Sequence, residues 1–395
     1  MALLGTIPSN AAHNWTTEYS AEVKKVSPLL QFPLSDTMPT LRIMLANAKP
    51  VNGGSGYGPR KRSYHNIQHA VYSPSRGTEK QVYTFPDLDP ITQSEWTPQI
   101  WWNGAGTDIY ELAAYGRDGS LYNLAEGKVN ALHLGNTLYM NYALFSNHNE
   151  TISGNELDIE SIMSTAGRRI PYPIKFKSIT DESQMIASIP TLIRKTTTGH
   201  TLGNIATGTT GSTANLFWQP KVTVPTGAAI TQNSTAGNNN VDTCTADNTT
   251  TVPLTIDILT EHLAEVQAGH QYKLYAPCGW KLYNFLRNQI LAEQQRVADQ
   301  YLKADLGINL SITLEEFNTV FYHEHMMDSL WPATIFFFDP ECLFLEYDPD
   351  FNPRIVAWED IPNSTMQGTV VSFWHNVVRP DPQGVSAIHG VTDES

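Results

Sequence analysis

The strongest hydrophobic pattern in the chain runs from Leu121 to Phe145, where apolar side chains recur every three or four residues. This spacing places them on one face of a helix, so it predicts a helix of about 26 residues. Ser120 stands where it can cap the start of that helix. Gly127 and Gly135 each weaken a helix by about 1 kcal/mol relative to alanine, so packing must help to hold it.

The segment after residue 253 predicts alternating helices and strands. Apolar positions at helical spacing run through 254–266 and again from about 280 to 302. Strands are expected at 272–276, 335–338, 343–345 and 369–378. The runs at 335–338 and 343–345 are continuously apolar, which is typical of strands covered on both faces.

The first hundred residues keep neither pattern for long. Up to about Gly106 there is no sustained helical period, and ten prolines interrupt the chain. Two short alternating runs, 66–72 and 81–85, predict an extended hairpin around a turn at 73–77. Aromatic and aliphatic residues are nevertheless frequent, unlike in disordered chains. Because apolar residues on an extended arm need a surface, we expect residues 1–50 and the 60–100 hairpin to bury on neighbouring copies.

Residues 196–253 are rich in Thr, Gly, Asn and Ser, with Lys221 as almost the only basic residue. The stretch 231–251 has the composition of an exposed loop or of short strands that tolerate changes in length. A flexible linker between two domains is the alternative interpretation of this region.

Composition is that of an ordinary globular protein, with 395 residues and 41% hydrophobic content. No apolar run approaches the roughly 18 residues of a membrane span. The N-terminal residues 1–5 lack the basic flank and long apolar core of a signal peptide. The three cysteines, Cys244, Cys278 and Cys342, are odd in number and widely spaced, which favours reduced thiols in a cytoplasmic setting.

The net charge of -14 is unevenly distributed along the chain. Residues 1–62 carry seven basic and three acidic side chains, whereas residues 339–395 carry ten acidic and two basic ones. An acidic chain without a basic stripe is not a dedicated nucleic-acid binder. Opposite charge at the two ends can steer one copy onto the next. A solvated acidic surface with a mildly basic arm is the simpler alternative.

Three short motifs carry residues that could support chemistry, and none predicts a site. His323-Glu324-His325 lacks the spacing of a helical zinc motif and is expected at a strand end or turn. Pro277-Cys278-Gly279-Trp280 lacks a located base, so it predicts packing at a helix start. The glycine-rich segment 53–58 lacks the end of a phosphate loop and is expected to be a flexible joint. We therefore predict no catalytic, cofactor-binding or metal-binding residue.

The order of these elements resembles the major capsid protein of tailed bacteriophages, whose α+β shell fold (the Hong Kong 97 type) also occurs in herpesviruses and encapsulins. Several local stretches are similar as well. They are Leu121–Glu126 through Asn141–Phe145, which resembles the spine helix and its end; Leu202–Ile205 followed by Phe217–Gln219, which resembles the segment after the spine; Thr334–Asp339 with Leu343–Leu345, which resembles a strand pair of the axial domain; and Gln383–Val385 with Gly390-Val391, which resembles the chain end.

The resemblance implies a division of the chain into the parts of that fold. These parts are an N-arm at 1–50, an extended E-loop hairpin at 51–105, a peripheral domain at 106–253 with a spine helix at about 120–146 and a polar loop at 225–252, an axial domain at 254–365, and a C-terminal strand at 366–395 that returns to the core. The Asn/Thr-rich segment 225–252 and the His323–His325 triplet depart from the family pattern.

The function implied by the resemblance is self-assembly rather than enzymatic activity. Copies would form pentamers and hexamers of an icosahedral virion shell, assembled in the host cytoplasm around double-stranded DNA without sequence-specific contacts or a membrane. Portal and scaffolding or decoration proteins would be the other partners. Some family members weld a hairpin lysine to a neighbour's asparagine, but Lys80 beside a turn is expected to be only a solvated charge. The alternatives are an encapsulin-type compartment and a soluble enzyme of unknown chemistry.

Overall fold

The computed structural model describes the chain in separate stretches. These are residues 38–51, 62–68, 91–96, 99–108, 120–145, 156–158, 175–177, 188–193, 200–202, 205–207, 218, 220–226, 229–232, 252–268, 270–294, 311–348, 354–360 and 366–393. Lys80, Cys244 and the glycine-rich segment 53–58 lie outside them.

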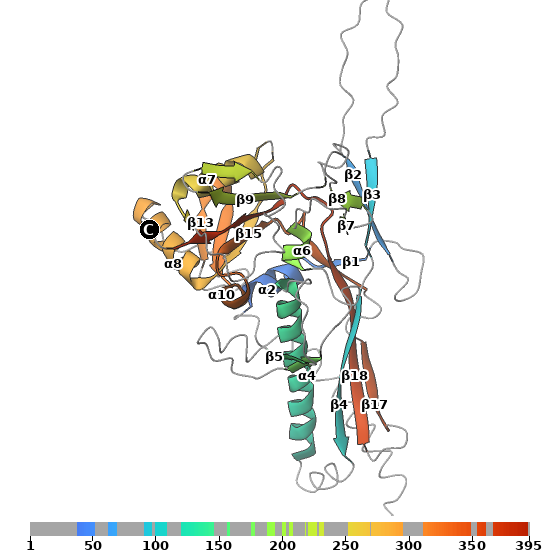
Figure 1. Ribbon diagram of the computed structural model, residues 1–395. Coiled ribbons are helices and arrows are strands. Elements are labelled where there is room, and N and C mark those ends of the chain that lie inside the picture. The colour runs from blue at the N-terminus through green and yellow to red at the C-terminus, as the bar shows by residue number, and fades with distance from the viewer. Residues whose placement is uncertain are drawn as a thin grey trace, which may run out of the picture.

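Among the described residues, seven strands form the larger sheet, which lies at the upper left of Figure 1. Their order across the sheet is β10 (Ala229–Gln232), β9 (Lys221–Thr226), β19 (Val385–His389), β15 (Thr334–Phe338), β12 (Leu274–Cys278), β14 (Thr319–His323) and β13 (Ser311–Leu314). The pairs β9–β19 and β12–β14 are parallel, and the other neighbours are antiparallel.

Both faces of this sheet are covered, which explains the apolar run of β15. Phe337 meets His262 of helix α7 (Ile256–Val266) at 5.1 Å between ring centroids. Phe336 meets Trp331, just beyond helix α10 (His325–Leu330), at 5.5 Å. Neighbouring side chains of a strand point to opposite faces of the sheet. Because both faces are covered, all five side chains of β15 are buried. Helix α8 (Trp280–Gln294) and the 3-10 turn η6 (Glu315–Phe317) complete this part of the fold.

A buried side chain of helix α7 links two strands that are distant in sequence. Thr255 caps the helix by accepting a hydrogen bond from the backbone N–H of Ile258. On its buried face, His262 bonds to Thr223 of β9 at 2.8 Å and to Ser386 of β19 at 3.0 Å. Burial lowers the pKa of His262 to about 3, so the imidazole is neutral and links the two strands through one ring.

The second sheet is elongated and lies beside the longest helix, as Figure 1 shows. Its central strand β18 (Met366–Val378) pairs with β4 (Gln99–Asp108) along one edge. The other edge pairs with β17 (Arg354–Asp360) and β16 (Phe344–Tyr347), and β16 pairs with β1 (Lys49–Pro50).

Helix α4 (Ser120–Phe145) is tied to β4 by two side-chain contacts. Lys128 Nζ donates to the carbonyl oxygen of Gly106 at 3.1 Å. Asn103 donates through Nδ2 to Oδ1 of Asn136, also at 3.1 Å. The helix and the long strands therefore form one elongated unit rather than independent rods.

Short elements complete the described chain. They are the hairpin of β2 (Ser63–Gln68) and β3 (Ile91–Trp96), the pairs β5 (Glu156–Asp158) with β6 (Lys175–Lys177), β7 (His200–Leu202) with β8 (Ile205–Thr207) and β11 (Val252–Pro253) with β20 (Val391–Thr392), and helices α2 (Pro39–Ala46) and α6 (Ile189–Ile193). Within the described ranges, no helix is both long and apolar enough to cross a membrane.

Most of the periodic patterns predicted the right element. The helix expected at 121–145 is confirmed as α4, and α7, α8, β15, β16 and β18 lie where they were expected, to within a few residues. The part of the second helix expected at 295–302 lies outside the described residues. Cys278 and Cys342 are free and buried.

The N-terminal expectation was wrong at residues 39–46. This segment forms helix α2, and its side chains Leu41, Ile43 and Met44 are buried in the chain's own core. Trp96 is also buried in that core. These apolar residues therefore need no neighbouring copy. Residues 1–37 of the expected arm lie outside the described chain.

Two further boundaries differ from the sequence-based expectation. The hairpin pairs 63–68 with 91–96, a register that joins Ser63 to Trp96, while the expected strand 81–85 lies outside the described residues. Strands β9 and β10 precede residue 254 yet belong to the larger sheet, and β16 and β17 follow it yet belong to the second. Sheet membership depends on hydrogen-bond partners far along the chain, so sequence order alone does not reveal it.

Candidate functional site

Several buried polar side chains among the described residues join separate elements, and Glu324 joins three of them. It follows β14 directly and is fully buried. Its Oε2 accepts hydrogen bonds from Thr40 of α2, from the backbone N–H at 3.2 Å and from Oγ1 at 2.8 Å. Its Oε1 accepts from Asn141 Nδ2 of α4 at 3.3 Å. One carboxyl group therefore joins the larger sheet to two helices.

Two opposing effects act on the pKa of Glu324, and burial is the larger of them. Burial raises the pKa of Glu324, and the hydrogen bonds from Thr40 and Asn141 act in the opposite direction. Tyr322 of β14, two residues before Glu324, shares a 3.0 Å hydrogen bond with Thr40 Oγ1. Burying a carboxyl group costs free energy, and the hydrogen bonds that Glu324 accepts offset this cost. The arrangement fixes the placement of α2 and α4 against β14.

A second contact fixes the end of α4. Trp331 donates from its indole Nε1 to the carbonyl oxygen of Phe145, the last residue of the helix, at 2.7 Å. The last four carbonyls of a helix lack partners within it, and this bond satisfies one of them. The long helix is thus attached to the larger sheet at its C-terminal end, beside the Glu324 junction.

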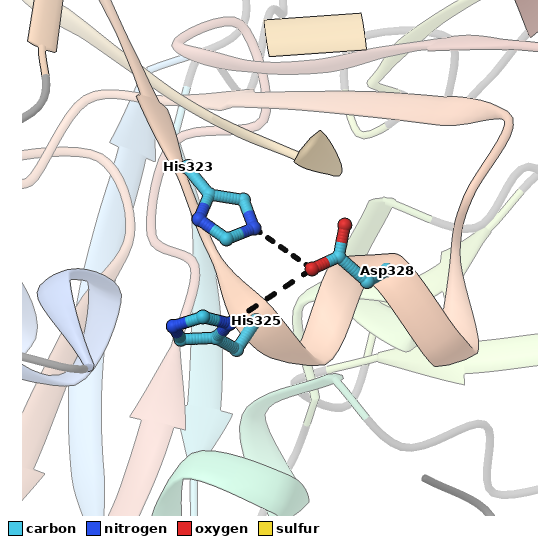
Figure 2. Close-up of side chains that lie close together, drawn as sticks. All are labelled: His323, His325 and Asp328. Carbon is cyan, nitrogen blue, oxygen red and sulfur yellow. Dashed lines mark hydrogen bonds and ion pairs between the residues drawn. The ribbon is translucent and has the colours of Figure 1, made fainter. Parts of the chain in front are cut away.

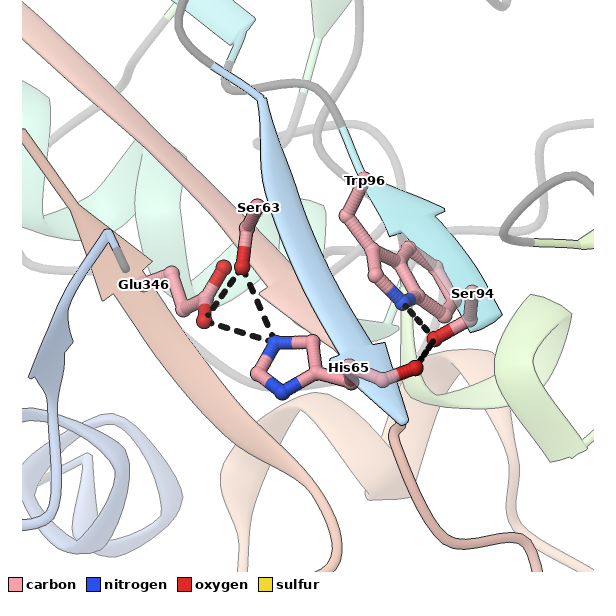
Figure 3. Close-up of polar contacts among 5 residues, drawn as sticks. All are labelled: Ser63, His65, Ser94, Trp96 and Glu346. Carbon is pink, nitrogen blue, oxygen red and sulfur yellow. Dashed lines mark hydrogen bonds and ion pairs between the residues drawn. The ribbon is translucent and has the colours of Figure 1, made fainter. Parts of the chain in front are cut away.

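The base of the hairpin is held by Glu346 of β16, which is 2% exposed. Figure 3 shows Ser63 and His65 of β2 converging on this side chain. Ser63 Oγ donates to Glu346 Oε1 at 2.9 Å, and His65 Nε2 lies 2.8 Å from the same oxygen. On β3, Trp96 Nε1 donates to Ser94 Oγ at 3.1 Å. The bonds from Ser63 and His65 attach the hairpin to the second sheet at its base, whereas the Trp96–Ser94 bond lies within β3.

Arg379 joins the end of β18 to two further segments. It is fully buried, donates to the carbonyl oxygens of Leu192 and Trp218, and lies 4.8 Å from the Trp218 ring centroid. Burial lowers the pKa of Arg379 to about 9, and the carboxylate of Asp381 acts in the opposite direction. Two nitrogen atoms of the guanidinium thus each donate to a different backbone carbonyl.

Titratable side chains gather at one further place, around Asp328 in the first turn of α10. His323 Nε2 lies 2.8 Å from Asp328 Oδ2, and His325 Nδ1 lies 3.9 Å from the same oxygen (Figure 2). β14 ends at His323 and α10 begins at His325, so the triplet marks a strand end, as the sequence suggested. The sequence interpretation missed Asp328, which the helical turn brings to both histidines.

Cys278 does not have the environment of a nucleophile. It is completely buried, its Sγ donates to the carbonyl oxygen of Tyr322 at 3.5 Å, and burial raises the pKa of its thiol. A reactive cysteine requires a depressed pKa and access to substrate. Its position at the end of β12, just before α8, agrees with the packing role expected from sequence.

Comparison with known proteins identifies the fold. Neither the family profiles nor the sequences of curated proteins match this chain. Among solved structures, the chain is similar to the capsid asymmetric unit of cyanophage A-1(L), with a TM-score of 0.53 and 12% identity over 90% of this chain and 93% of that one.

Two other solved structures are similar to this chain with TM-scores below 0.5. The capsid of a native GTA particle has a TM-score of 0.47 and 11% identity, over 89% of this chain and 91% of that one. A virus-like particle from Pyrococcus furiosus has a TM-score of 0.35 and 10% identity, over 94% and 98%.

The nearly complete coverage of the cyanophage subunit confirms the fold that the sequence resemblance implied. The chain is an α+β protein with the Hong Kong 97-type capsid fold. The junctions at Glu324, Glu346 and Arg379 join separate parts of that fold in this chain.

Proposed function

We propose that this chain is the major capsid protein of a tailed bacteriophage and that it assembles into the icosahedral shell around double-stranded DNA. The observation that carries the proposal is the similarity to the cyanophage A-1(L) capsid subunit over nine-tenths of the chain. The function of such a fold is to build interfaces, so its working parts are the surfaces and the junctions that orient them.

The described elements support an assignment to the parts of a capsid subunit. The seven-stranded sheet with α7, α8 and α10 is the axial domain, extended by β9, β10 and β19. Helix α4 with β4, β17 and β18 forms the spine and peripheral domain, and β2 with β3 forms the base of the E-loop. Pentamers and hexamers would form around the axial domain, with portal and scaffolding or decoration proteins as further partners.

This assignment gives the polar junctions a mechanical role. An interface between copies persists when it buries on the order of 1,000 Å² or more, and closed contacts of this kind produce a shell. Small changes in the angle between spine and axial domain would move the distant surfaces out of register. Glu324 and Trp331 fix that angle at one end of α4, and Glu346 fixes the direction in which the hairpin leaves the subunit.

The proposal is tested by expressing the full chain and examining it by size-exclusion chromatography and negative-stain electron microscopy. We expect closed particles far larger than a 43.9 kDa chain. A small, monodisperse species that never forms particles, even with the other phage proteins present, would contradict the proposal. Particles that assemble only around a protein cargo would favour an encapsulin-type compartment instead.

A further inference from the structure

The residues His323, His325 and Asp328 form a cluster of possible metal ligands where β14 ends and α10 begins. His323 is the last residue of β14, whereas His325 and Asp328 lie in the first turn of α10. One ligand atom from each lies within 4.8 Å of the other two. Figure 2 shows both imidazole rings directed at the Asp328 carboxylate. The side chains of His323 and Asp328 are 8% and 9% exposed, and that of His325 is 48% exposed.

We propose that this cluster is a binding site for a divalent transition-metal ion of the Zn²⁺ class. Two imidazoles and one carboxylate form a donor set typical of Zn²⁺ sites that keep one position open. Ca²⁺ and Mg²⁺ favour oxygen ligands, so the two ring nitrogens select against them. The ion binds between His323 Nε2, His325 Nδ1 and Asp328 Oδ2.

The three ligand atoms lie within 4.8 Å of one another, so the more distant of them must move closer together to bind one ion. Tetrahedral bonds of about 2.0–2.2 Å place the ligand atoms roughly 3.3–3.5 Å apart. The His323–Asp328 separation of 2.8 Å must open slightly, and the His325–Asp328 separation of 3.9 Å must close. His325 is the most exposed of the three, so its side chain has room to make the larger movement. The ion replaces the hydrogen that His323 and Asp328 share.

The surrounding residues hold the ligands in place. The backbone N–H of Trp280 donates to Asp328 Oδ1 at 2.5 Å, which leaves Oδ2 facing the histidines. The rings of Trp280 and Tyr283 lie 5.2 and 6.5 Å from the His323 ring. Such outer contacts orient ligands and raise metal affinity. They close one side of the site, so the fourth ligand, a water molecule or a donor from another molecule, enters from the side of His325.

A purely structural role is the competing explanation. Asp328 accepts a hydrogen bond at the start of α8 and pairs with His323, and this role does not require an imidazole at position 325. Replacing His325 therefore separates the two explanations. His270, another exposed histidine outside the cluster, provides a matched control.

The experiment titrates the purified full chain with Co²⁺, followed by its visible absorption, and then displaces the Co²⁺ with Zn²⁺. We expect one tight equivalent per chain with the strong absorption of a tetrahedral ion. His325→Ala should weaken binding by more than about 100-fold, since the loss of an outer contact alone costs about 10–100-fold. His270→Ala should bind like the unmodified chain.

Three results would overturn the proposal. They are the absence of a tight equivalent, equal binding by His325→Ala, or an octahedral spectrum that Zn²⁺ does not displace. Asp328→Asn provides an independent check, because the amide oxygen can still accept from Trp280 while the charged ligand is lost. Its binding should fall together with that of His325→Ala, and the melting temperature without metal shows whether each variant is folded. Particle formation is measured separately, so either proposal can fail alone.

Discussion

Glu324→Ala is expected to destabilise the folded chain by about 3 kcal/mol or more and to abolish the formation of regular particles. The substitution leaves the backbone N–H of Thr40 and the side-chain amide of Asn141 buried without their acceptor. Each buried donor without a partner costs about 1–3 kcal/mol, and the cavity left by the side chain adds to that. Urea unfolding and the yield of particles measure the effect.

Glu324→Gln is the matched control for this prediction. Its carbonyl oxygen can still accept from Thr40, and its amide can donate to Asn141 Oδ1 once the Asn141 amide turns over, because Oδ1 has no partner among the described residues and Nδ2 now faces Glu324. We expect it to keep most of the stability that Glu324→Ala loses. If the alanine and glutamine variants both unfold and assemble like the unmodified chain, the carboxyl group does not join α2, α4 and β14 in the way we describe.

Leu132→Pro is expected to have an effect of similar size through the spine helix. Leu132 is buried near the middle of α4. Proline removes a backbone donor and clashes with the preceding turn, at about 3 kcal/mol or more. The expected result is soluble aggregate or unassembled chain in place of particles, measured by sedimentation and negative-stain imaging.

The control for the spine helix is Leu132→Met, which keeps the volume and the backbone donor and should cost less than about 1.5 kcal/mol. Lys128→Ala is a less neutral comparison, because Lys128 donates to Gly106 of β4. Equal particle yields from the proline and methionine variants would show that an intact α4 is not needed for assembly.

The sequence could predict those elements in which the spacing of apolar residues within the element itself indicates a helix or a strand. The 26 residues of α4 span many turns, so its apolar face is visible without any partner. The Ile-Phe-Phe-Phe run of β15 shows in the same way that both faces of the strand are covered. The buried face of α7 and its Thr255 cap are likewise local features.

Helix α2 could not be recognised because it is stabilised by contacts with residues far along the chain. It has eight residues, too few for a periodic pattern, and Pro39 at its start is the one signal of a helix N-terminus. Its burial depends on partners far along the chain, such as Glu324, which bonds to Thr40 across 284 residues. The register of the hairpin was missed for the same reason, because Glu346, which holds its base, is also far along the chain.

The histidine cluster shows where motif spacing failed. His323 and His325 alternate as they would on a strand, which gave no reason to consider Asp328. The strand ends at His323, and the helical turn that follows brings Asp328, three residues after His325, to the same face as both histidines. A change of secondary structure inside a motif alters which side chains meet, and spacing rules assume a single period.

The most direct test of the central claim is a cryo-electron microscopy reconstruction of particles formed by the full chain. We predict a closed icosahedral shell in which the seven-stranded sheet surrounds the five-fold and six-fold positions. The hairpin that begins at β2 and β3 should leave its Glu346 anchor and lie across a neighbouring copy. A small oligomer without a closed shell, or a shell in which this hairpin contacts only its own chain, would contradict the account.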